Sequence, residues 1–407
     1  MRQQNMKYKS PEHNDKPSNG DIAGSREGGP VVMQVLPAME TGGAEQGCLD
    51  IHKELVRAGA KSIVVCNGGP RIHEIQRAGG HYIQLPVESK NPLQIRKNTK
   101  HLQDIIRQFS VDIVHARSRA PAWSCLSACR AEKTKFVTTC HAPYNAGNAL
   151  KRRYNSVMAM GDRVIAISEY VAQYLRDNHN VPDSALRVIH RGIPVENYHP
   201  TSVSPERMIQ LSKAWRLPEE ASIILLPGRL TRWKGQHILI RAMARIENPN
   251  AFAVILGADQ GRQKYRRELE SLIAEHDLQD RIRLVDHCND MPAAYMLSTL
   301  VVSASTDPEG FGRVPVEAMA MGRIAIATDH GAARETVVSG ETGWLVPPDN
   351  VTSLAKTIDK SLSMPEPERV RMATRGMKRV EEMFSREDMV NKTFDVYAEL
   401  LRAEAVS

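Results

Sequence analysis

The chain has 407 residues, too many for one typical hydrophobic core, so its length predicts two domains. Its hydrophobic content of 42% is ordinary for a globular protein, and no apolar run approaches the ~18 residues of a membrane-spanning helix. The net charge of +7 leaves nucleic acid, an anionic membrane and an acidic substrate open as partners.

The first segment, residues 1–29, is polar and rich in Pro, Gly, Ser and Asn. It contains no apolar stretch that could serve as a secretion signal, so we expect a disordered tail on a cytoplasmic protein. The six cysteines form no CxxC pair and have no histidines at zinc spacing. This pattern predicts reduced, packed thiols and no metal site.

Short β-branched runs then alternate with longer helical patterns, which is typical of parallel α/β sheets. A second series of alternating strands and helices begins near residue 221. It follows a proline-containing segment at 191–208 that we interpret as a linker. We therefore expect two doubly wound domains that bind ligands at the carboxyl ends of their strands and face each other across a cleft. The predicted strands are 31–36, 62–66, 112–116, 135–139, 163–167 and 186–190, and then 222–226, 252–256, 281–285, 299–305 and 323–327.

Positive charge is concentrated in the first half of the chain. Residues 1–200 hold 27 Lys and Arg against 18 Asp and Glu, whereas residues 201–407 hold 27 against 29. The densest basic run is Lys151, Arg152 and Arg153. No zinc finger or RNP-like aromatic pattern accompanies it, which disfavours nucleic acid.

The first predicted strand leads into Gly42 and Gly43 and then a helix. These glycines let a ligand approach the backbone at the helix N-terminus. The stretch is not GxGxxG, and no acidic residue follows at the distance expected for a ribose, so it is weak as a dinucleotide site. A plain tight turn is the alternative interpretation.

In the second half, the strand 222–226 leads into Gly228, Arg229, Lys234 and Gly235, and then a helix. Two cations in a loop at the ligand-binding edge of a sheet can converge on a diphosphate, Arg through its fork and Lys as a point charge. The alternative interpretation is that these cations are ordinary solvent-exposed charges with no ligand, and we assign Arg232 to that group.

The stretch EGFGRVPVEAMAMG at 309–322 places two carboxylates, Glu309 and Glu317, around a Gly-Phe-Gly turn that opens an apolar helix. Gly310 and Gly312 expose backbone N–H groups at the helix N-terminus, which favours an anion such as phosphate. Carboxylates beside a phosphate are repelled by it, so their natural partners are hydroxyl groups. The pattern predicts a phosphorylated polyol, although ordinary helix capping would also explain the Glu pair taken alone.

His141 follows the predicted strand at 135–139 and Cys140, so it lies at the carboxyl end of that strand and faces the expected cleft. We interpret His141 as a functional residue because of this position. His115 and His190 also end strands, and we interpret both as structural.

Four segments together carry a resemblance to a known family: GRLTRWKGQ (228–236), EGFGRVPVEAMAMG (309–322), His141 and GETGWLVPPDN (340–350). They resemble glycosyltransferase family 4, retaining nucleotide-sugar transferases of the GT-B fold that include bacterial polysaccharide and lipopolysaccharide enzymes. The likeness covers about residues 30–400, and its motifs occur in the family's order.

For the reaction, the resemblance implies roles for four residues. The family's Arg and Lys that match Arg229 and Lys234 bind the donor diphosphate and stabilise the leaving group in place of a metal ion. The Glu matching Glu309 contacts the donor sugar near the transferred carbon, and the His matching His141 lies near the C6 hydroxyl of the sugar. No metal and no other cofactor is expected.

For donor binding, the resemblance implies that Glu317 holds the ribose hydroxyls and that the backbone at Phe311 and Gly312 lies against sugar and phosphate. Gly42 and Gly43 match an acceptor-side loop that also approaches the diphosphate, and Gly228 belongs to the diphosphate loop. His287 and Cys288 follow the strand where the family holds the base by backbone, so neither is assigned a catalytic role.

The resemblance also implies a domain layout. We expect an acceptor-binding Rossmann-like domain at 30–200, a donor-binding one at 201–385 and a final helix at 386–407 that crosses back to the first. Residues 366–405 are helical in pattern, in keeping with such an ending. Pro194 replaces an Asp common in the family's linker, which puts a polar contact at the hinge in doubt.

The expected function is metal-independent, retaining transfer of a hexosyl unit from a UDP- or GDP-sugar to a glycan or lipid-linked acceptor in cell-surface polysaccharide or lipopolysaccharide synthesis. Alternatives are a sucrose- or trehalose-type synthase or a nucleotide-sugar epimerase with a soluble acceptor, and a non-catalytic nucleotide-sugar binding protein. The basic first half predicts an anionic acceptor or membrane surface. The expected location is cytoplasmic, with peripheral attachment to the inner face of the membrane.

Overall fold

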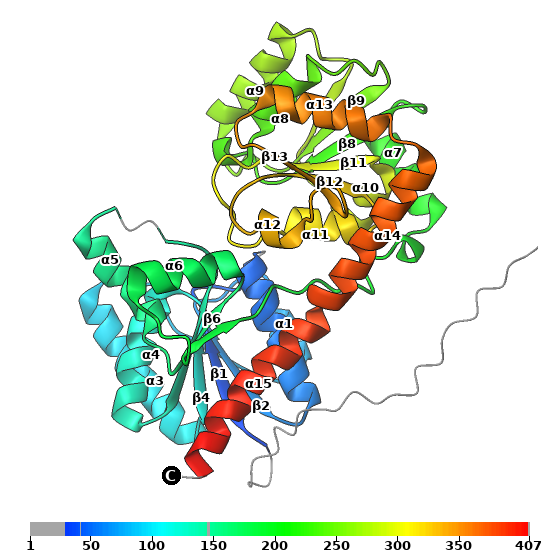
Figure 1. Ribbon diagram of the computed structural model, residues 1–407. Coiled ribbons are helices and arrows are strands. Elements are labelled where there is room, and N and C mark those ends of the chain that lie inside the picture. The colour runs from blue at the N-terminus through cyan, green and yellow to red at the C-terminus, as the bar shows by residue number, and fades with distance from the viewer. Residues whose placement is uncertain (1–28, 41, 145–146, 406–407) are drawn as a thin grey trace, which may run out of the picture.

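The computed structural model describes residues 29–40, 42–144 and 147–405 of the chain. The tail expected at residues 1–29 lies, except for Gly29, outside these described residues. Two α/β domains follow each other along the chain, each built on one parallel sheet with helices on both faces (Figure 1). The fold class expected from the sequence is therefore confirmed.

The first domain contains a seven-stranded sheet in the order β3-β2-β1-β4-β5-β6-β7. The interior strands are buried without alternation, as expected for a parallel sheet covered on both faces. The strands are β1 (Val31–Val35), β2 (Lys61–Cys66), β3 (His81–Gln84), β4 (Ile113–Ala116), β5 (Lys135–Cys140), β6 (Arg163–Ala166) and β7 (Leu186–Val188).

The helices of this domain connect consecutive strands. They are α1 (Gly43–Arg57), α2 (Ile72–Arg77), α3 (Pro92–Phe109), α4 (Arg119–Glu132), α5 (Ala149–Asn155), the 3-10 helix η1 (Ser156–Ala159) and α6 (Glu169–His179).

The second domain contains a six-stranded parallel sheet in the order β10-β9-β8-β11-β12-β13. Its strands are β8 (Ser222–Pro227), β9 (Ala251–Leu256), β10 (Ile282–Val285), β11 (Leu300–Ser303), β12 (Ile324–Thr328) and β13 (Gly343–Val346). Its helical segments are η2 (Pro200–Ser202), α7 (Pro205–Trp215), η3 (Arg232–Lys234), α8 (Gln236–Met243), α9 (Gln263–Glu275), α10 (Met291–Leu297), α11 (Arg313–Ala320), α12 (Ala333–Thr336), α13 (Val351–Leu362) and α14 (Glu366–Met383).

Each of the predicted strands coincides with an observed strand, but β3 and β13 were not predicted. Both are four-residue strands at the edge of their sheets. β3 reads HYIQ and β13 reads GWLV, so each has one β-branched residue and neither carries the β-branched run that marked the predicted strands.

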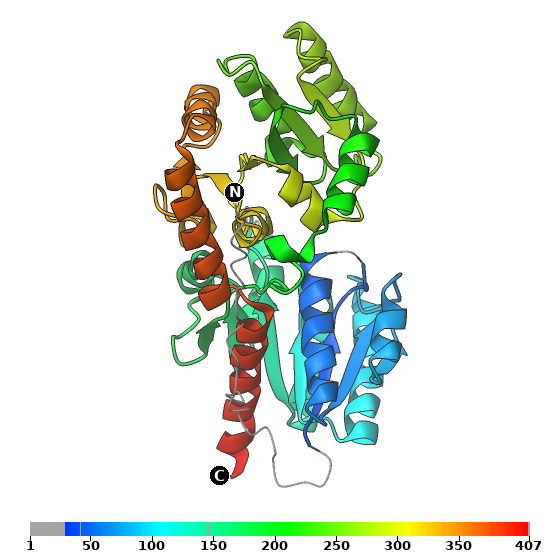
Figure 2. The ribbon, with the colours of Figure 1, turned by 90° about the vertical axis from the view of Figure 1, so that its right-hand side faces the viewer.

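The last helix of the described chain, α15 (Arg386–Ala405), returns to the first domain (Figures 1 and 2). Its residues Met389, Val390 and Tyr397 share a buried cluster with Val32 of β1 and Ile51 of α1. The helix therefore completes the core of the domain that the chain began. Within the described residues, no helix has the length and apolar character needed to span a bilayer.

The chain passes between the domains twice, and the two crossings pair with each other. The backbone N–H of Ile193 donates to the Phe384 carbonyl at 2.9 Å, and the N–H of Arg386 donates to the Ile193 carbonyl at 2.8 Å. A Cβ on Gly192 would stand 2.5 Å from Arg386 Cα, so only glycine permits this approach. The junction is thus shorter than the linker predicted at 191–208, because helix α7 (Pro205–Trp215) already begins within that segment.

Candidate functional site

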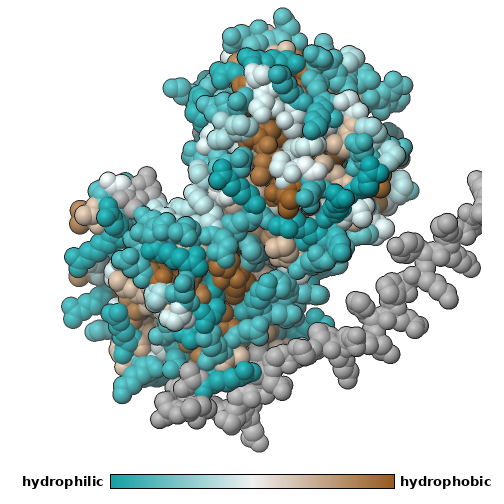
Figure 3. Space-filling view, in the orientation of Figure 1, coloured by the Kyte–Doolittle hydropathy of each residue, from teal (hydrophilic) through white to brown (hydrophobic). Residues whose placement is uncertain are grey.

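Each sheet has one place where the strand order reverses, and loops at the carboxyl ends of strands on either side of such a point form a binding crevice. In the first domain this point lies between β1 and β4, and in the second between β8 and β11. Predicted site loops follow β1, β8 and β11, and the predicted His141 follows β5, the neighbour of β4. Figure 3 shows the surface hollowed between the two domains, above the part of the lower domain that carries α5 and α6.

The loop after β8 is shaped by glycines at its ends. Gly235 adopts φ +72°, and a Cβ there would lie 1.9 Å from the Ala304 carbonyl oxygen. Gly228 lies against the stem of Lys234, since a Cβ on it would be 3.6 Å from Lys234 Cδ. The loop therefore packs closely against the end of β11 and holds the lysine in one place.

Lys234 and Glu309 form the central polar contact of this site. Lys234 Nζ lies 2.8 Å from Glu309 Oε1, with 15% and 19% of the two side chains exposed. Ser305, which follows β11, donates its hydroxyl to the same carboxylate oxygen. Lys234 Nζ also lies 4.4 Å from the Trp233 ring centroid, a cation–π distance. The structure thus brings together the lysine and the first acid predicted from the sequence.

Arg229 does not join this pair. The residue is exposed, and no ion pair or hydrogen bond of its guanidinium is found among the described residues. Its backbone carbonyl accepts from Gln236 Nε2 at 2.9 Å. The guanidinium is therefore free to meet a ligand at the rim of the crevice, and its predicted contact with a diphosphate stays a prediction.

Glu317 is buried, with 7% of the residue exposed, and both of its carboxylate oxygens have protein partners. Tyr295 donates its hydroxyl to Oε2 at 2.7 Å, and Arg313 NH2 lies 2.7 Å from Oε1. The carboxylate raises the pKa of Arg313, and burial followed by the same negative charge raises the pKa of Tyr295. Each carboxylate oxygen retains a second lone pair for a ligand hydroxyl.

Gly312 precedes α11 in the left-handed region, at φ +78°, and no side chain caps the start of that helix. The adjoining Phe311 is 3% exposed and stacks edge-on with Phe384 at 5.6 Å between ring centroids. Among the described residues, the start of α11 therefore has no side-chain cap and follows the loop that carries Glu309, and an anion bound at its N–H groups stays a prediction.

On the facing domain, Gly42 precedes α1 in an extended conformation and also provides no cap. The Glu45 carboxylate folds back over it, since a Cβ on Gly42 would lie 2.2 Å from Glu45 Oε2. The start of α1 thus combines a glycine at the N-cap position with an acidic side chain from its own first turn.

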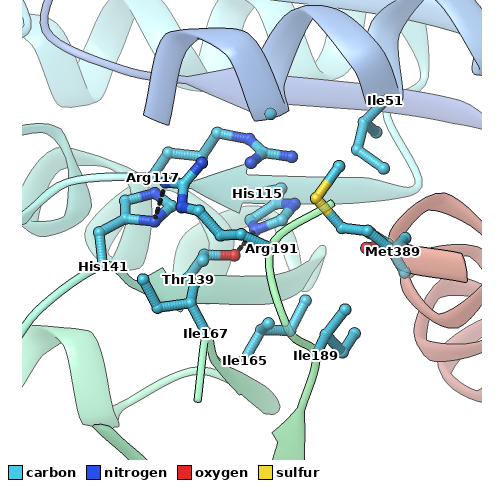
Figure 4. Close-up of a pocket in the computed structure, with 12 residues that line it drawn as sticks. Ile51, His115, Arg117, Thr139, His141, Ile165, Ile167, Ile189, Arg191 and Met389 are labelled. Carbon is cyan, nitrogen blue, oxygen red and sulfur yellow. Dashed lines mark hydrogen bonds between the residues drawn. The ribbon is translucent and has the colours of Figure 1, made fainter. Parts of the chain in front are cut away.

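His141 lies beside this loop, and Arg191 fixes its protonation. Arg191 NH2 donates to His141 Nδ1 at 2.7 Å (Figure 4), so the neutral ring carries its proton on Nε2. Burial, followed by the charges of Arg191 and Arg117, holds the pKa of His141 well below 6.5. Nε2 is buried without a hydrogen-bond partner among the described residues, which leaves this N–H for a ligand oxygen.

The two domains touch at the acidic loop. A Cβ on Gly310 would lie 2.7 Å from the His141 carbonyl oxygen, and the Ser168 hydroxyl donates to the Gly310 carbonyl at 2.6 Å. The predicted His141 and the predicted 309–312 loop are therefore neighbours although they belong to different domains.

Glu335 of α12 makes a further contact between the domains that the sequence did not suggest. Its two carboxylate oxygens accept the N–H groups of Glu169 and Tyr170, at the start of α6, at 2.7 Å each. His190 Nε2 lies 3.0 Å from Oε2. Burial alone would raise the pKa of Glu335, but the hydrogen bonds from His190, Tyr170 and Glu169 outweigh it, so this pKa is lowered. The second domain thus caps the N-terminus of helix α6 in the first domain with a carboxylate.

Replacing Glu335 with Gln is expected to loosen the domain contact, because an amide presents only one acceptor oxygen to two N–H groups and carries no charge. Hydrogen bonds to charged groups are each worth about 1.5–3 kcal/mol. Small-angle scattering of the unliganded variant should show a larger radius of gyration. Because the folded pKa lies below the ordinary 4.5, the wild-type contact is present above that pH and is lost as pH falls through the lowered value.

The matched control is Glu341→Gln, which removes the same charge from an exposed position in the same domain. It should leave the scattering curve unchanged. Equal curves for the wild type and Glu335→Gln would show that the contact does not hold the domains together.

Four residues of the site were not singled out by a glycine-rich loop or by a position directly after a predicted strand: Tyr295, Ser305, Arg313 and Glu335. Arg117 and Arg191 could have been found, because each follows a strand at the ligand-binding edge of the sheet. Among the described residues, no group of three or more His, Cys, Asp and Glu side chains is placed to hold a metal ion.

Two protein-family descriptions match the chain, one for each domain. Residues 41–197 match "Glycosyltransferase Family 4", and residues 208–379 match "Glycosyl transferases group 1". The boundary between the two matches falls in the segment that joins the two sheets.

Known structures resemble the chain over nine-tenths of its length, and a curated relative matches it over a shorter part. A crystal structure of a glycosyltransferase from Rickettsia africae ESF-5 is 34% identical, with TM-score 0.86, covering 91% of this chain and 98% of the other. The lipopolysaccharide core biosynthesis mannosyltransferase LpsB of Rhizobium meliloti is 30% identical over 59% of this chain and 66% of its own. The crystal structure of Anabaena HepE in complex with UDP and glucose shares the fold, with a TM-score of 0.80 and 22% identity. The match covers 91% of this chain and 100% of the other.

Proposed function

Because the chain belongs to glycosyltransferase family 4 and is a glycosyltransferase of the GT-B fold, we propose that it transfers a hexosyl unit from a UDP- or GDP-linked sugar. The proposed acceptor is a glycan or lipid-linked sugar in the synthesis of a cell-surface polysaccharide or lipopolysaccharide. The relationship to the mannosyltransferase LpsB supports this acceptor class.

The observation that carries the proposal is the Lys234–Glu309 contact, 2.8 Å long, beside the uncapped start of α11. A cation and a helix N-terminus suit a leaving diphosphate, whose negative charge grows as the bond to the sugar breaks. The adjacent carboxylate suits the hydroxyl groups or the developing positive charge of the sugar.

In the proposed reaction, the acceptor oxygen forms a bond to the anomeric carbon and the bond from that carbon to the donor phosphate breaks. The electron pair leaves with the phosphate oxygen, and the acceptor proton moves to the departing phosphate. Lys234 and Arg229 supply the positive charge, so we propose transfer without a metal ion. Glu309 and Glu317 lie on one loop and helix rather than flanking a bond from opposite faces, which favours front-face transfer over hydrolysis by two opposed carboxylates.

Binding of the donor can be tested before the sugar is known. A nucleotide at 100 times its Kd raises the free energy of unfolding by about 2.7 kcal/mol, because it binds only the native protein. Thermal unfolding with UDP, GDP and ADP should therefore show one series that raises the Tm. The increase should shrink in Arg229→Met, because the Arg229 side chain is exposed and loses no partner among the described residues. If none of the three nucleotides raises the Tm, the chain does not bind a nucleotide sugar.

The alternatives differ in what they make. A sucrose- or trehalose-type synthase would give a soluble disaccharide, an epimerase would give free or nucleotide-linked epimer, and a binding protein would consume no donor. Incubation of the stabilising nucleotide sugar with a membrane extract and with simple sugars separates these products by chromatography. Transfer into lipid-linked material supports the proposal.

We also propose that the first domain docks on an anionic membrane surface. Leu150 of α5 is 80% exposed, and Lys151, Arg152 and Arg153 beside it are exposed as well. An apolar tip beside cations is suited to a bilayer interface that carries anionic lipid.

Neutralising Lys151, Arg152 and Arg153 with glutamine is expected to weaken vesicle binding about 100-fold, since each cation near an anionic surface contributes about 1 kcal/mol. Co-sedimentation with phosphatidylglycerol vesicles measures this. The matched control neutralises Arg371, Arg375 and Lys378, three exposed cations of α14. An equal loss from both triple variants would show general charge attraction and no docking site at α5.

A further inference from the structure

The loop at 309–312, which carries Glu309, is held partly by the first domain. The Ser168 hydroxyl donates to the Gly310 carbonyl at 2.6 Å, and a Cβ on Gly310 would lie 2.7 Å from the His141 carbonyl oxygen. The same Ser168 oxygen accepts the N–H of Val171 at 3.1 Å, which caps the start of α6. Ser168 is completely buried. One buried hydroxyl therefore joins the start of a helix in the first domain to the backbone beside Glu309.

The second domain fixes the same loop through the turn before α12. The N–H of Ala332 donates to the Glu309 carbonyl at 3.1 Å. Gly331 lies against this carbonyl, since a Cβ there would be 2.7 Å from its oxygen. Glu335, on α12 itself, accepts the first two N–H groups of α6. The 309–312 loop and α12 therefore both contact the start of α6, which lies beneath α11 and α12 in Figure 1.

The carboxylate of Glu309 has one oxygen engaged and one left for a ligand. Lys234 Nζ and the Ser305 hydroxyl both contact Oε1. Two donors use both lone pairs of that oxygen. Among the described residues, Oε2 forms no hydrogen bond or ion pair, so it is the atom that can accept from a ligand hydroxyl. Because Oε1 is fixed between two donors, a shift of the loop backbone either breaks these contacts or turns Oε2 to a new direction.

The Ser168 contact depends on how the two domains are arranged. Ser168 and Gly310 are 142 residues apart and belong to different domains. The chain crosses between the domains at the paired backbones of Ile193 and Phe384, so a rotation about this junction moves the two residues relative to each other. A hydrogen bond is lost beyond about 3.5 Å, so a displacement of about 1 Å from the present 2.6 Å breaks it. The 309–312 loop then keeps its contacts within the second domain and loses this one.

We infer that Ser168 is a positioning residue for the transfer reaction. Its hydroxyl holds the 309–312 loop where Glu309 Oε2 meets the donor sugar, and it does so only while the two domains are closed. This inference rests on the proposed function, which assigns Glu309 to the donor sugar. Ser168 is buried and acts through the Gly310 carbonyl, without touching the substrate. The first domain, proposed to bind the acceptor, thus also sets the position of the acid in the second.

Ser168→Gly tests this role without removing the helix start. Glycine is nearly as favourable as serine at an N-cap, and Glu335 still accepts two of the N–H groups of α6. We expect kcat to fall about tenfold or more, because a misplacement of about 1 Å can cost about 10²-fold in rate. KM for the nucleotide sugar should stay unchanged, because Lys234 and Arg229 are not altered. Ser168→Thr keeps the hydroxyl and should restore kcat, whereas a wild-type kcat in Ser168→Gly overturns the inference.

Asn91→Gly is the matched control in the same domain. The Asn91 side chain caps α3 by accepting the N–H of Leu93 at 2.9 Å. This variant also replaces a capping side chain with glycine, so it should show a similar small change in Tm but a wild-type kcat. An equal fall of kcat in both variants would mean that helix capping in the first domain, and not the contact with Gly310, supports turnover. That result also overturns the inference.

Hydrogen exchange of the N–H groups in the 309–312 loop provides a readout that needs no activity. In the unliganded protein, this exchange should be faster in Ser168→Gly than in the wild type, because the loop has lost its contact with the first domain. Asn91→Gly should exchange at the wild-type rate. Equal exchange in the wild type and Ser168→Gly overturns the inference even if kcat falls. Failure of the wild type to bind or turn over any nucleotide sugar overturns the proposed function instead, and the exchange rates still decide whether Ser168 holds the loop.

Discussion

Lys234→Met is expected to lower the rate of sugar transfer by about 10²–10³-fold, the loss seen when one preorganised donor to a developing negative charge is removed. Met keeps the length of the stem that packs against Gly228 and Trp233 but removes the charge. It also removes the cation 2.8 Å from Glu309, which leaves the Ser305 hydroxyl as the side-chain partner of the acid among the described residues. Steady-state turnover of the stabilising nucleotide sugar measures the effect, which should fall mainly on kcat.

A control for this variant lies two residues away. Arg232 belongs to the same 3-10 turn, but its side chain is 62% exposed and pairs with Glu268. Arg232→Met should keep turnover within about twofold of wild type, since exposed ion pairs contribute little. Similar losses in both variants would mean that the turn as a whole, and not the Lys234 charge, supports the reaction.

Gly235→Ala is expected to destabilise the second domain by about 3 kcal/mol or more and to abolish activity. The residue adopts φ +72°, which disfavours any side chain by about 1–2 kcal/mol. The new Cβ would also lie 1.9 Å from the Ala304 carbonyl oxygen, so the loop that carries Lys234 must move away from β11. Chemical denaturation gives the loss in the free energy of unfolding.

Gly261→Ala separates the two causes. Gly261 also has a positive φ, +84°, but nothing lies within 4 Å of a Cβ built on it. This variant should lose only about 1 kcal/mol and keep its activity. If Gly235→Ala were no worse than Gly261→Ala, the close approach of the lysine loop to β11 would be unimportant.

The interior of both sheets could be predicted from the sequence because parallel strands covered on both faces are continuous apolar runs. β9, for example, is buried at all six of its residues. β3 (HYIQ) and β13 (GWLV) were missed because each contains a single β-branched residue, so neither gives the β-branched run by which the other strands, including the edge strands β7 and β10, were predicted. The return of α15 to the first domain came from the family resemblance, since its helical pattern alone does not say which domain it covers.

The candidate site was predictable where its chemistry lies within one loop. Glycines and charges close in sequence marked the loops of Lys234 and Glu309. Contacts between distant positions left no such mark: Tyr295 and Glu317 are 22 residues apart, Arg191 and His141 are 50 apart, and Tyr170 and Glu335 are 165 apart. The first two pairs depend on how loops and helices pack within one domain and the third on how the domains meet, and no local pattern reports either.

The path of α15 has a consequence for how the protein is made. The second domain is one uninterrupted stretch of chain, so all of its strands have left the ribosome before α15 is synthesised. The first domain, although translated earlier, keeps the apolar face around Val32 and Ile51 open until Tyr397 and its neighbours arrive to cover it. The half of the protein that emerges first is therefore the half that finishes folding last.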